Sequence, residues 1–218
     1  MAIKALVAVR SGSVRVKNKN LRPFAGSSLL ELKLEQLQRI RGLDGVIVNS
    51  NDDVMLDIAR SMGCETVKRD PMYATNSISM SEVYRNMAEH CDCDEIAYIN
   101  CTNPLIRDET IENAIEAYYR MEGFDSLNSA HLIKEFMFYK GKPVNYDLRR
   151  QPRSQDLPDY YALNFAVSVI ARETMIACRN VVGKCPWIYP IDPVEATDID
   201  DPIDFEFAEY LYKKRHSR

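Results

Sequence analysis

The chain has 218 residues, and its 46% hydrophobic and 28% charged content is ordinary for a folded globular protein, which excludes wholesale disorder. The length fits one α/β domain with a substantial core. The formal net charge of −4 gives no general electrostatic reason to bind nucleic acid. The sequence has no apolar run close to the roughly 20 residues of a membrane helix and no signal peptide, so we expect a cytoplasmic protein that does not enter a membrane.

The N-terminal part of the chain alternates apolar runs with helical patterns. Residues 3–9 are nearly all apolar and predict a buried strand, after which a polar loop follows. From Ser28 on, leucines recur at helical spacing, so we expect an amphipathic helix capped by one of the two serines at its start. Residues 45–50 predict a second buried strand. Residues 53–62 predict a helix that ends at Gly63.

The same alternation continues through the middle of the chain. Residues 64–69 predict a short strand, residues 80–90 a helix, and residues 95–100 another buried strand. We expect Asp108 to cap a further helix that runs to about residue 121. This alternation is typical of a mainly parallel sheet that is covered by helices on both faces.

The rhythm changes between residues 125 and 161, where short β-like pieces and a polar stretch rich in Arg, Pro and Asp replace it. We interpret 125–161 as an inserted element used for self-association, within a single domain that spans 1–218. Residues 164–171 and 187–191 predict two more strands. Pro202 opens the final helix.

The six cysteines do not form a metal-binding pattern. Cys91 and Cys93 are close in sequence, but no second close pair follows and the three histidines are scattered. We therefore expect free thiols in a reducing compartment.

The loop RSGSVRVKNKN at residues 10–20 is the most informative segment. It directly follows the first predicted strand, so it lies at the carboxyl edge of the sheet, where open α/β sheets bind ligands. Gly12 and its neighbouring serines leave backbone amides accessible. The basic side chains can hold a triphosphate by charge-assisted hydrogen bonds. The loop matches neither GxGxxG nor GxxxxGK[ST], which disfavours a Rossmann cofactor and a P-loop, and a solvated basic turn is the alternative.

The segment TDIDDPID precedes the last predicted helix and concentrates carboxylates. Side chains alternate along an extended segment, so Asp198 and Asp200 lie on the same side and can reach one ion. Mg²⁺ prefers oxygen ligands and commonly takes one or two carboxylates together with phosphates and water. Asp201, directly before Pro202, is instead expected to cap the helix.

These motifs together resemble the acylneuraminate (CMP-sialic acid) cytidylyltransferase family. The loop contains the family's pattern A-x-R-x-x-S, completed by Lys-Asn-Leu at residues 19–21. Similar blocks follow at family-like intervals over nearly the whole chain, among them INCTNPLI and RSQDLPDYYALNFAVSVI. The resemblance implies a three-layer α/β fold of the nucleotide-diphospho-sugar transferase type. It also implies a homodimer that transfers CMP from CTP to an acidic sugar of the nonulosonic type with the help of Mg²⁺.

The loop and the resemblance together suggest a role for individual residues. The residues expected to bind the nucleotide are Arg10, Gly12, Ser13, Arg15, Lys19, Asn20 and Arg69. The residues expected to bind the acceptor are Asn100, Thr102, Arg153, Gln155, Asn164 and Phe165. The expected metal ligands are Asp198 and Asp200, and the expected catalytic residues are Arg10, Lys19 and Asp200.

Several positions depart from the family pattern. Val14-Arg15 stands where Lys-Gly is common, and an arginine at this place is similar to the CMP-KDO synthetases. Asn100 stands where the family usually has Gln, and Phe165 where it has Gly. A shorter amide and a bulkier side chain should change the sugar pocket, so we expect N-acetylneuraminate not to be the best acceptor.

Three other functions stay open on the sequence. One is a CMP-KDO-type synthetase, which Arg15 favours. Another is a metal-dependent glycosyltransferase, because the DID of residues 198–200 resembles a DxD motif, although such a motif normally follows a central strand. The third is a catalytically inactive nucleotide-binding protein, which the departures from the family pattern would allow.

Overall fold

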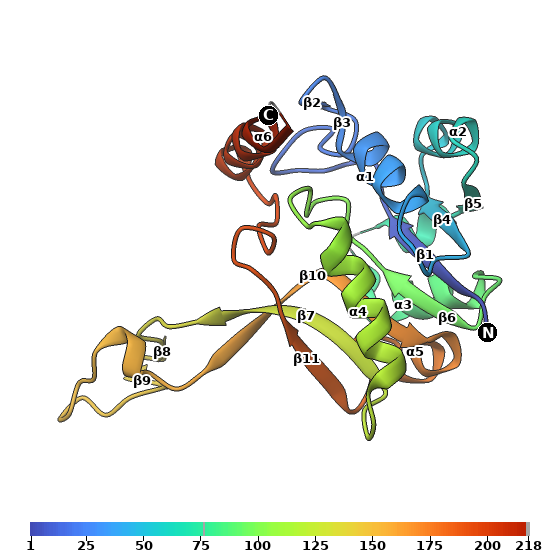
Figure 1. The fold of residues 1–218 in the computed structure, drawn as a ribbon. Helices are drawn as coiled ribbons and strands as arrows, with labels where there is room; N and C mark the ends of the chain where they lie inside the picture. Colours follow the sequence, from blue (N-terminus) through green and yellow to red (C-terminus); the bar gives the residue numbers. More distant parts are fainter. Residues whose placement is uncertain (76, 217–218) are drawn as a thin grey trace.

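The computed structural model describes residues 1–75 and 77–216 and is built around one seven-stranded sheet of order β11-β7-β10-β6-β1-β4-β5 (Figure 1). Its strands are β1 (Ile3–Ala8), β4 (Gly45–Ser50), β5 (Glu65–Lys68), β6 (Glu95–Tyr98), β7 (Ser126–Ile133), β10 (Tyr160–Ala171) and β11 (Pro186–Pro190). β1 pairs in parallel with β4 and β6, and β4 with β5. β10 runs antiparallel to both of its neighbours, β6 and β7. The expected mainly parallel sheet is confirmed.

Helices cover both faces of the sheet and make three layers. They are α1 (Leu29–Gln38), α2 (Asp53–Ser61), α3 (Met80–Glu89), α4 (Asp108–Arg120), α5 (Arg172–Cys178) and α6 (Pro202–His216). Apolar side chains of α1, α2 and α4 pack on one face of β1, with Ala5 and Val7. Side chains of α3 and α5 pack on the other face, with Leu6. Within the two described ranges, no helix is long and apolar enough to cross a membrane.

Most predicted boundaries agree with the structure because the local signals are strong. Ser28 is the N-cap of α1, where its hydroxyl donates to a Glu31 carboxylate oxygen at 2.6 Å and accepts from the Glu31 N–H at 3.2 Å. Gly63 follows the end of α2 with a φ of +77°, a left-handed conformation that favours glycine. The six cysteines are free, as expected.

Two predictions about helices were wrong or incomplete. Asp108 does not cap α4, because Arg107 occupies the N-cap position and makes no side-chain capping bond. The Asp108 carboxylate instead accepts from Arg39 Nε at 2.5 Å and from Gln36 Nε2 at 2.9 Å, so it ties α4 to α1. The short helix α5 was not predicted, since only Met175 of its side chains is buried and the helical pattern is weak.

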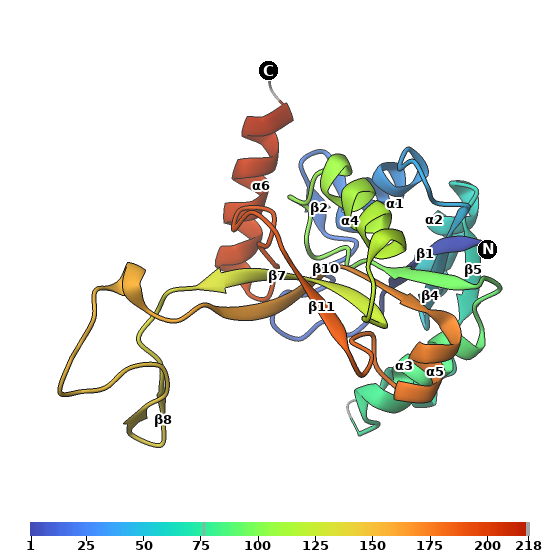
Figure 2. The same cartoon turned by 60° about the horizontal axis from the view of Figure 1, so that its bottom comes forward.

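The long strands β7 and β10 leave the body of the sheet and carry a projection, which we call the arm (Figures 1 and 2). The arm comprises residues 134–159, because Ile133 and Tyr160 still pair within the sheet. It contains β8 (Phe138–Tyr139), β9 (Lys142–Pro143) and the 3₁₀ turn η2 (Ser154–Asp156). A smaller hairpin of β2 (Pro23–Phe24) and β3 (Ser27–Ser28) and the 3₁₀ turn η1 (Pro71–Ala74) complete the fold.

Asp201 caps α6, and its removal tests this directly. Its Oδ1 accepts from the backbone N–H of Ile203 at 3.0 Å and of Asp204 at 3.3 Å, and Asp204 Oδ2 accepts in return from the N–H of Asp201 at 2.9 Å. We expect Asp201→Ala to lower the free energy of unfolding by about 1 kcal/mol in urea denaturation, since an N-cap is lost. Asp201→Asn keeps the acceptor and should cost much less. An equal loss in both variants would contradict the capping role.

Candidate functional site

Three segments that are distant in sequence meet at the carboxyl edge of β1 and β6. They are the basic loop of residues 10–20, the segment after β6 from Asn100 to Thr102, and the acidic segment before α6. Together they enclose a cavity of about 290 Å³, which we call the loop cavity. Its polar lining residues are Arg10, Ser13, Arg15, Lys19, Asn20, Asn100, Thr102 and Asp200. The sequence therefore predicted most of the polar side chains that the fold brings together here.

The basic loop is held in place by bonds to the surrounding strands and turns. The Arg10 guanidinium donates to the Ala74 carbonyl at 2.9 Å, and the Lys19 ammonium donates to the carbonyl of Ile199. Asn20 is only 6% exposed, and its side-chain oxygen accepts from the Cys101 thiol at 3.2 Å. Asn20 therefore joins the loop to the end of β6.

Gly12 lies at the exposed turn of the loop with a φ of +86°. It does not line the loop cavity itself, but Ser13, which follows it, does. On its other side, the Ser11 N–H donates to Asn51 Oδ1 at 3.2 Å, and Asn51 Nδ2 donates to the Ser11 hydroxyl at 3.0 Å. Asn51 was not predicted, although it directly follows a parallel strand at the same edge of the sheet.

The two predicted metal ligands lie in different surroundings. Asp200 is about half exposed, and its Oδ1 accepts from Arg15 Nη2 at 2.5 Å. Asp198 is more buried, and its Oδ1 has no hydrogen-bond partner among the residues that the structure describes. Burial is the main cause that raises the pKa of Asp198, the negative charge of Asp200 raises it further, and a hydrogen bond from Thr102 lowers it. An orphaned buried carboxylate oxygen next to a second carboxylate suits a hard cation.

Within the described residues, no group of three or more His, Cys, Asp or Glu side chains is arranged to hold a metal ion. A complete protein cage is therefore absent from residues 1–75 and 77–216. Two carboxylates agree instead with Mg²⁺, which commonly completes its octahedral shell with substrate phosphates and water.

A second cavity of about 360 Å³ adjoins the loop cavity and shares Ala8, Val9 and Arg10 with it. It is more apolar, with lining side chains that include Tyr73, Ile78, Val83, Met87 and Tyr98. Arg69 also lines it.

Arg69 is fixed in the wall of this second cavity by Asn49, a residue that was not predicted. Arg69 is only 5% exposed, and burial lowers the pKa of its guanidinium. Its Nε donates to Asn49 Oδ1 at 2.6 Å, and its Nη2 donates to the Asn49 carbonyl at 3.1 Å. Asn49 stands near the carboxyl end of β4, so the rule that ligands bind at this edge could have suggested it.

The predicted acceptor residues do not all lie together. Asn100 and Thr102 line the loop cavity. Asn164 is 7% exposed, and its Oδ1 accepts from the Ser129 hydroxyl at 2.6 Å, while its Nδ2 is buried without a partner among the described residues. Phe165 has a φ of +53° where the register of β10 against β7 shifts, so a backbone bulge sets the direction of its side chain.

Arg153 and Gln155 belong to the turn η2 of the arm and do not line the loop cavity of the same chain. The arm projects from the body of the sheet (Figure 2). Both residues are exposed, and Arg153 Nε forms an ion pair with Asp156 Oδ2 at 2.8 Å. The prediction that they join the other acceptor residues is not met within one chain, because sequence order gave no information on how far β7 and β10 carry the arm outward.

The Asn49–Arg69 contact is open to a double-mutant cycle. Asn49→Ala should lower the free energy of unfolding by about 1–3 kcal/mol, because it leaves buried guanidinium donors unpaired. In an Asn49→Ala/Arg69→Met protein those donors are gone, so the combined loss should be smaller than the sum of the two single losses. Urea denaturation of the four proteins measures this, and strictly additive losses would show that the contact is not coupled.

Comparison with known proteins places this chain in a family. Over 216 residues the chain is 26% identical to the N-acylneuraminate cytidylyltransferase of Oncorhynchus mykiss, which covers 95% of this chain but only 49% of that protein. The chain thus spans about half the length of that relative. It is 24% identical over 227 residues to the pseudaminic acid cytidylyltransferase of Campylobacter jejuni, covering 97% of this chain and 96% of the relative.

The fold also has a close counterpart among solved structures. A CMP:2-keto-3-deoxy-manno-octonic acid synthetase, solved in complex with CTP, superimposes with a TM-score of 0.73 over 99% of this chain and 100% of that one. At 11% identity this likeness shows the fold alone. The family model described as Cytidylyltransferase matches residues 4–149, which include the basic loop, Arg69 and the segment after β6. The chain belongs to the cytidylyltransferase family.

Proposed function

We propose that this protein transfers CMP from CTP to an acidic sugar of the nonulosonic type and releases pyrophosphate. A hydroxyl of the acceptor attacks the α-phosphorus of CTP, a new P–O bond forms, and the bond to the pyrophosphate oxygen breaks. Such transfers depend on positioning and on neutralising charge. The observation that carries the proposal is the loop cavity, where the basic loop and the Asp200 carboxylate border one space that Asn100 and Thr102 also line.

In this proposal the triphosphate lies along the basic loop. Arg10, Arg15 and Lys19 neutralise its charge, while Ser13, Asn20 and the backbone around Gly12 orient it. The Arg15 bond to Asp200 and the Lys19 bond to the Ile199 carbonyl must exchange for bonds to phosphate oxygens when the nucleotide binds. The cytidine part occupies the adjoining second cavity, where Arg69 lies against the apolar lining.

We propose Asp198 and Asp200 as ligands of the Mg²⁺ that the reaction uses. The support is the pair of carboxylates itself, one of them with an oxygen that no donor reaches among the residues that the structure describes. When bound, the ion neutralises phosphate charge and lowers the pKa of the attacking hydroxyl. Arg10 and Lys19 then share with Asp200 the task of holding the reacting groups in line.

The acceptor is proposed to lie beside Asn100 and Thr102, with Asn164 and Phe165 shaping the far side of its site. The relatives act on N-acylneuraminate and on pseudaminic acid, as their names state. The short amide of Asn100 and the bulk of Phe165 favour an acceptor other than N-acetylneuraminate, such as a modified nonulosonate or another ulosonic acid.

We also propose that the protein works as a homodimer in the cytoplasm. Apolar side chains on the arm are open to solvent, with Phe138 53% exposed, Tyr139 66% and Leu148 63%. Exposed apolar surface of this kind is typical of an interaction site. A second copy seated on the arm would cover it, and Arg153 and Gln155 could then reach the acceptor of that copy. Free cysteines agree with a reducing compartment.

The direct test is pyrophosphate release with each of CTP, UTP, ATP and GTP, in the presence of Mg²⁺ and a panel of acidic sugars. We expect release with CTP to exceed release with the other nucleotides by at least about tenfold, which corresponds to roughly 1.4 kcal/mol of discrimination. The mass of the CMP-sugar product identifies the acceptor. Equal rates with all nucleotides, or release that needs no acceptor, would refute the proposal.

The acceptor preference can be tested separately with CTP held constant. We expect kcat/KM for N-acetylneuraminate to be lower than for at least one modified nonulosonate or other ulosonic acid. Phe165→Gly should raise kcat/KM for N-acetylneuraminate relative to that acceptor, because it removes the bulk and fits the positive φ. If N-acetylneuraminate is the best substrate of the unmodified protein, Asn100 and Phe165 do not set the preference.

Metal dependence can be tested on the two carboxylates. Asp198→Asn and Asp200→Asn should each lower kcat by about 100-fold or more, since each removes a charged metal ligand near the reacting phosphate. Binding of Mn²⁺ to the protein with CTP, measured by electron paramagnetic resonance, should weaken in the same variants. Asp192→Asn, a change to an exposed carboxylate outside the cavity, is the matched control. Unchanged Mn²⁺ affinity in both test variants would exclude them as ligands.

A further inference from the structure

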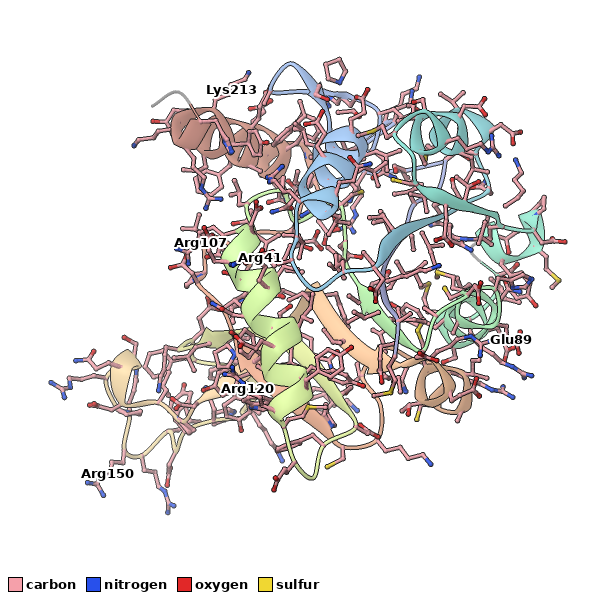
Figure 3. The ribbon with its side chains drawn as sticks, turned by 45° about the vertical axis from the view of Figure 1, so that its right-hand side comes forward. Arg41, Glu89, Arg107, Arg120, Arg150 and Lys213 are labelled. Carbon is pink, nitrogen blue, oxygen red and sulfur yellow. The ribbon has the colours of Figure 1, made fainter. Side chains whose placement is uncertain are left out.

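A third cavity, of about 190 Å³, lies between α1, the segment that leads into α4, and α6, and we call it the α1–α6 cavity. It shares no lining residue with the loop cavity or with the second cavity. Figure 3 shows the part of the molecule where α6, which carries Lys213, lies near Arg107 at the start of α4. The charged and polar residues of the lining are Lys33, Gln36, Arg39, Arg107, Asp108, Glu109, Arg215 and His216.

Lys33 forms the buried wall of this cavity. The residue is only 2% exposed, and its Nζ donates to Gln36 Oε1 at 2.6 Å and to the Asn103 carbonyl at 3.1 Å. These bonds use two of the three N–H groups of an ammonium. Both acceptors are neutral, and a neutral donor could make the same bonds without the cost of burying a charge. A third partner that is anionic would explain why a lysine stands here.

The charges around the cavity leave two cations without a carboxylate partner among the described residues. Arg39 is paired with Asp108, and Arg107 is paired with Glu195. Arg215, in contrast, donates to the carbonyl of Leu105 at 2.9 Å and so makes its bond to a neutral acceptor, as Lys33 does. Two basic side chains that form no ion pair among the described residues therefore line the same small space.

The start of α4 adds donors to the same space. Asp108 and Glu109, the first two residues of this 13-residue helix, line the cavity. Arg107 at the N-cap makes no side-chain capping bond, so the first-turn N–H groups lack the usual side-chain acceptor. A helix N-terminus favours an anion, although the carboxylates of Asp108 and Glu109 oppose one. The site must therefore draw its selectivity from Lys33 and Arg215.

We propose that the α1–α6 cavity binds a small tetrahedral oxyanion of the phosphate class, held by Lys33, Arg215 and the first-turn N–H groups of α4. The anion accepts hydrogen bonds from the third N–H of the Lys33 ammonium and from N–H groups along one edge of the Arg215 guanidinium. This site is separate from the candidate active site and does not depend on the proposed transfer reaction.

Titration of inorganic phosphate, followed by isothermal calorimetry, tests the proposal on the full chain. Lys33→Met and Arg215→Gln should each weaken phosphate binding at least tenfold. Lys214→Gln changes an exposed cation on the same helix that does not line the cavity, so it should bind as the unmodified protein does. Lys19→Gln, which weakens the candidate active site, should also leave this binding event unchanged. Glycerol phosphate in place of inorganic phosphate distinguishes a free anion from a phosphate ester.

Three results would overturn the proposal. The first is the absence of saturable phosphate binding. The second is phosphate binding that is lost in Lys19→Gln but retained in Lys33→Met and Arg215→Gln, because the phosphate then occupies the candidate active site. The third result concerns the pKa of Lys33 in the unmodified protein. Burial lowers this pKa to about 7; the charge of Asp108 raises it and that of Arg39 lowers it. Bound phosphate should raise this pKa in a pH titration of the lysine Cε signals by nuclear magnetic resonance. An unchanged pKa at saturating phosphate would exclude contact, and this measurement stands even if Lys33→Met fails to fold.

Discussion

The parallel pairing of β1 with both β4 and β6 is the constraint on which the site depends. Because three neighbouring strands run in one direction, the segments that follow them all emerge at the same edge. This brings the basic loop, Asn49 and Asn51, and the segment from Asn100 to Thr102 together, although they are up to 92 residues apart in sequence. The strands are held by core packing on both faces, so the position of the candidate site depends on the hydrophobic core of the sheet.

Charged side chains of the candidate site pair with one another. The Arg15–Asp200 pair joins the predicted phosphate-binding loop to the predicted metal-binding segment. The Arg15 side chain is 65% exposed and that of Asp200 49%. Exposed ion pairs contribute roughly 0–1 kcal/mol, so a triphosphate with its cation can separate this pair at low cost. Asp198 differs, because burial raises the free energy of its ionised carboxylate unless a cation or a further hydrogen-bond donor binds to it. The exposed Arg15–Asp200 pair is therefore easily separated, whereas the more buried Asp198 carboxylate needs a partner for its charged form.

Buried basic side chains stand in the walls of two of the cavities. Arg69 is anchored by Asn49 in the wall of the second cavity, and Lys33 by Gln36 and Asn103 in the wall of the α1–α6 cavity. Asn103 in turn donates to the Thr197 carbonyl at 3.1 Å, one residue before Asp198. Lys33 and the acidic segment therefore share a short chain of hydrogen bonds, so a change at one can alter the position of the other.

The sequence by itself determined the elements and much of the site. Apolar runs, helical spacing and caps such as Ser28 and Gly63 are local signals, and they located nearly all strands and helices because neighbouring residues decide them. The order of those elements placed the basic loop and the residues after β6 at one edge. Asp108 was misjudged for a related reason, since a capping residue and an ion-pairing residue look alike until the partner, here Arg39, is in place.

Only the tertiary structure decided what depends on long-range packing. It showed that Arg153 and Gln155 lie on an arm outside the loop cavity, because the lengths of β7 and β10 beyond the sheet set that position. It showed that Phe165 stands at a bulge with a positive φ, a backbone state that the sequence of a strand does not reveal. It also buried Lys33 in the wall of a cavity that Arg215, 182 residues later in the chain, lines as well. A lysine on an amphipathic helix normally reaches solvent, and only the packing of α6 and the segment before α4 over α1 closes that route.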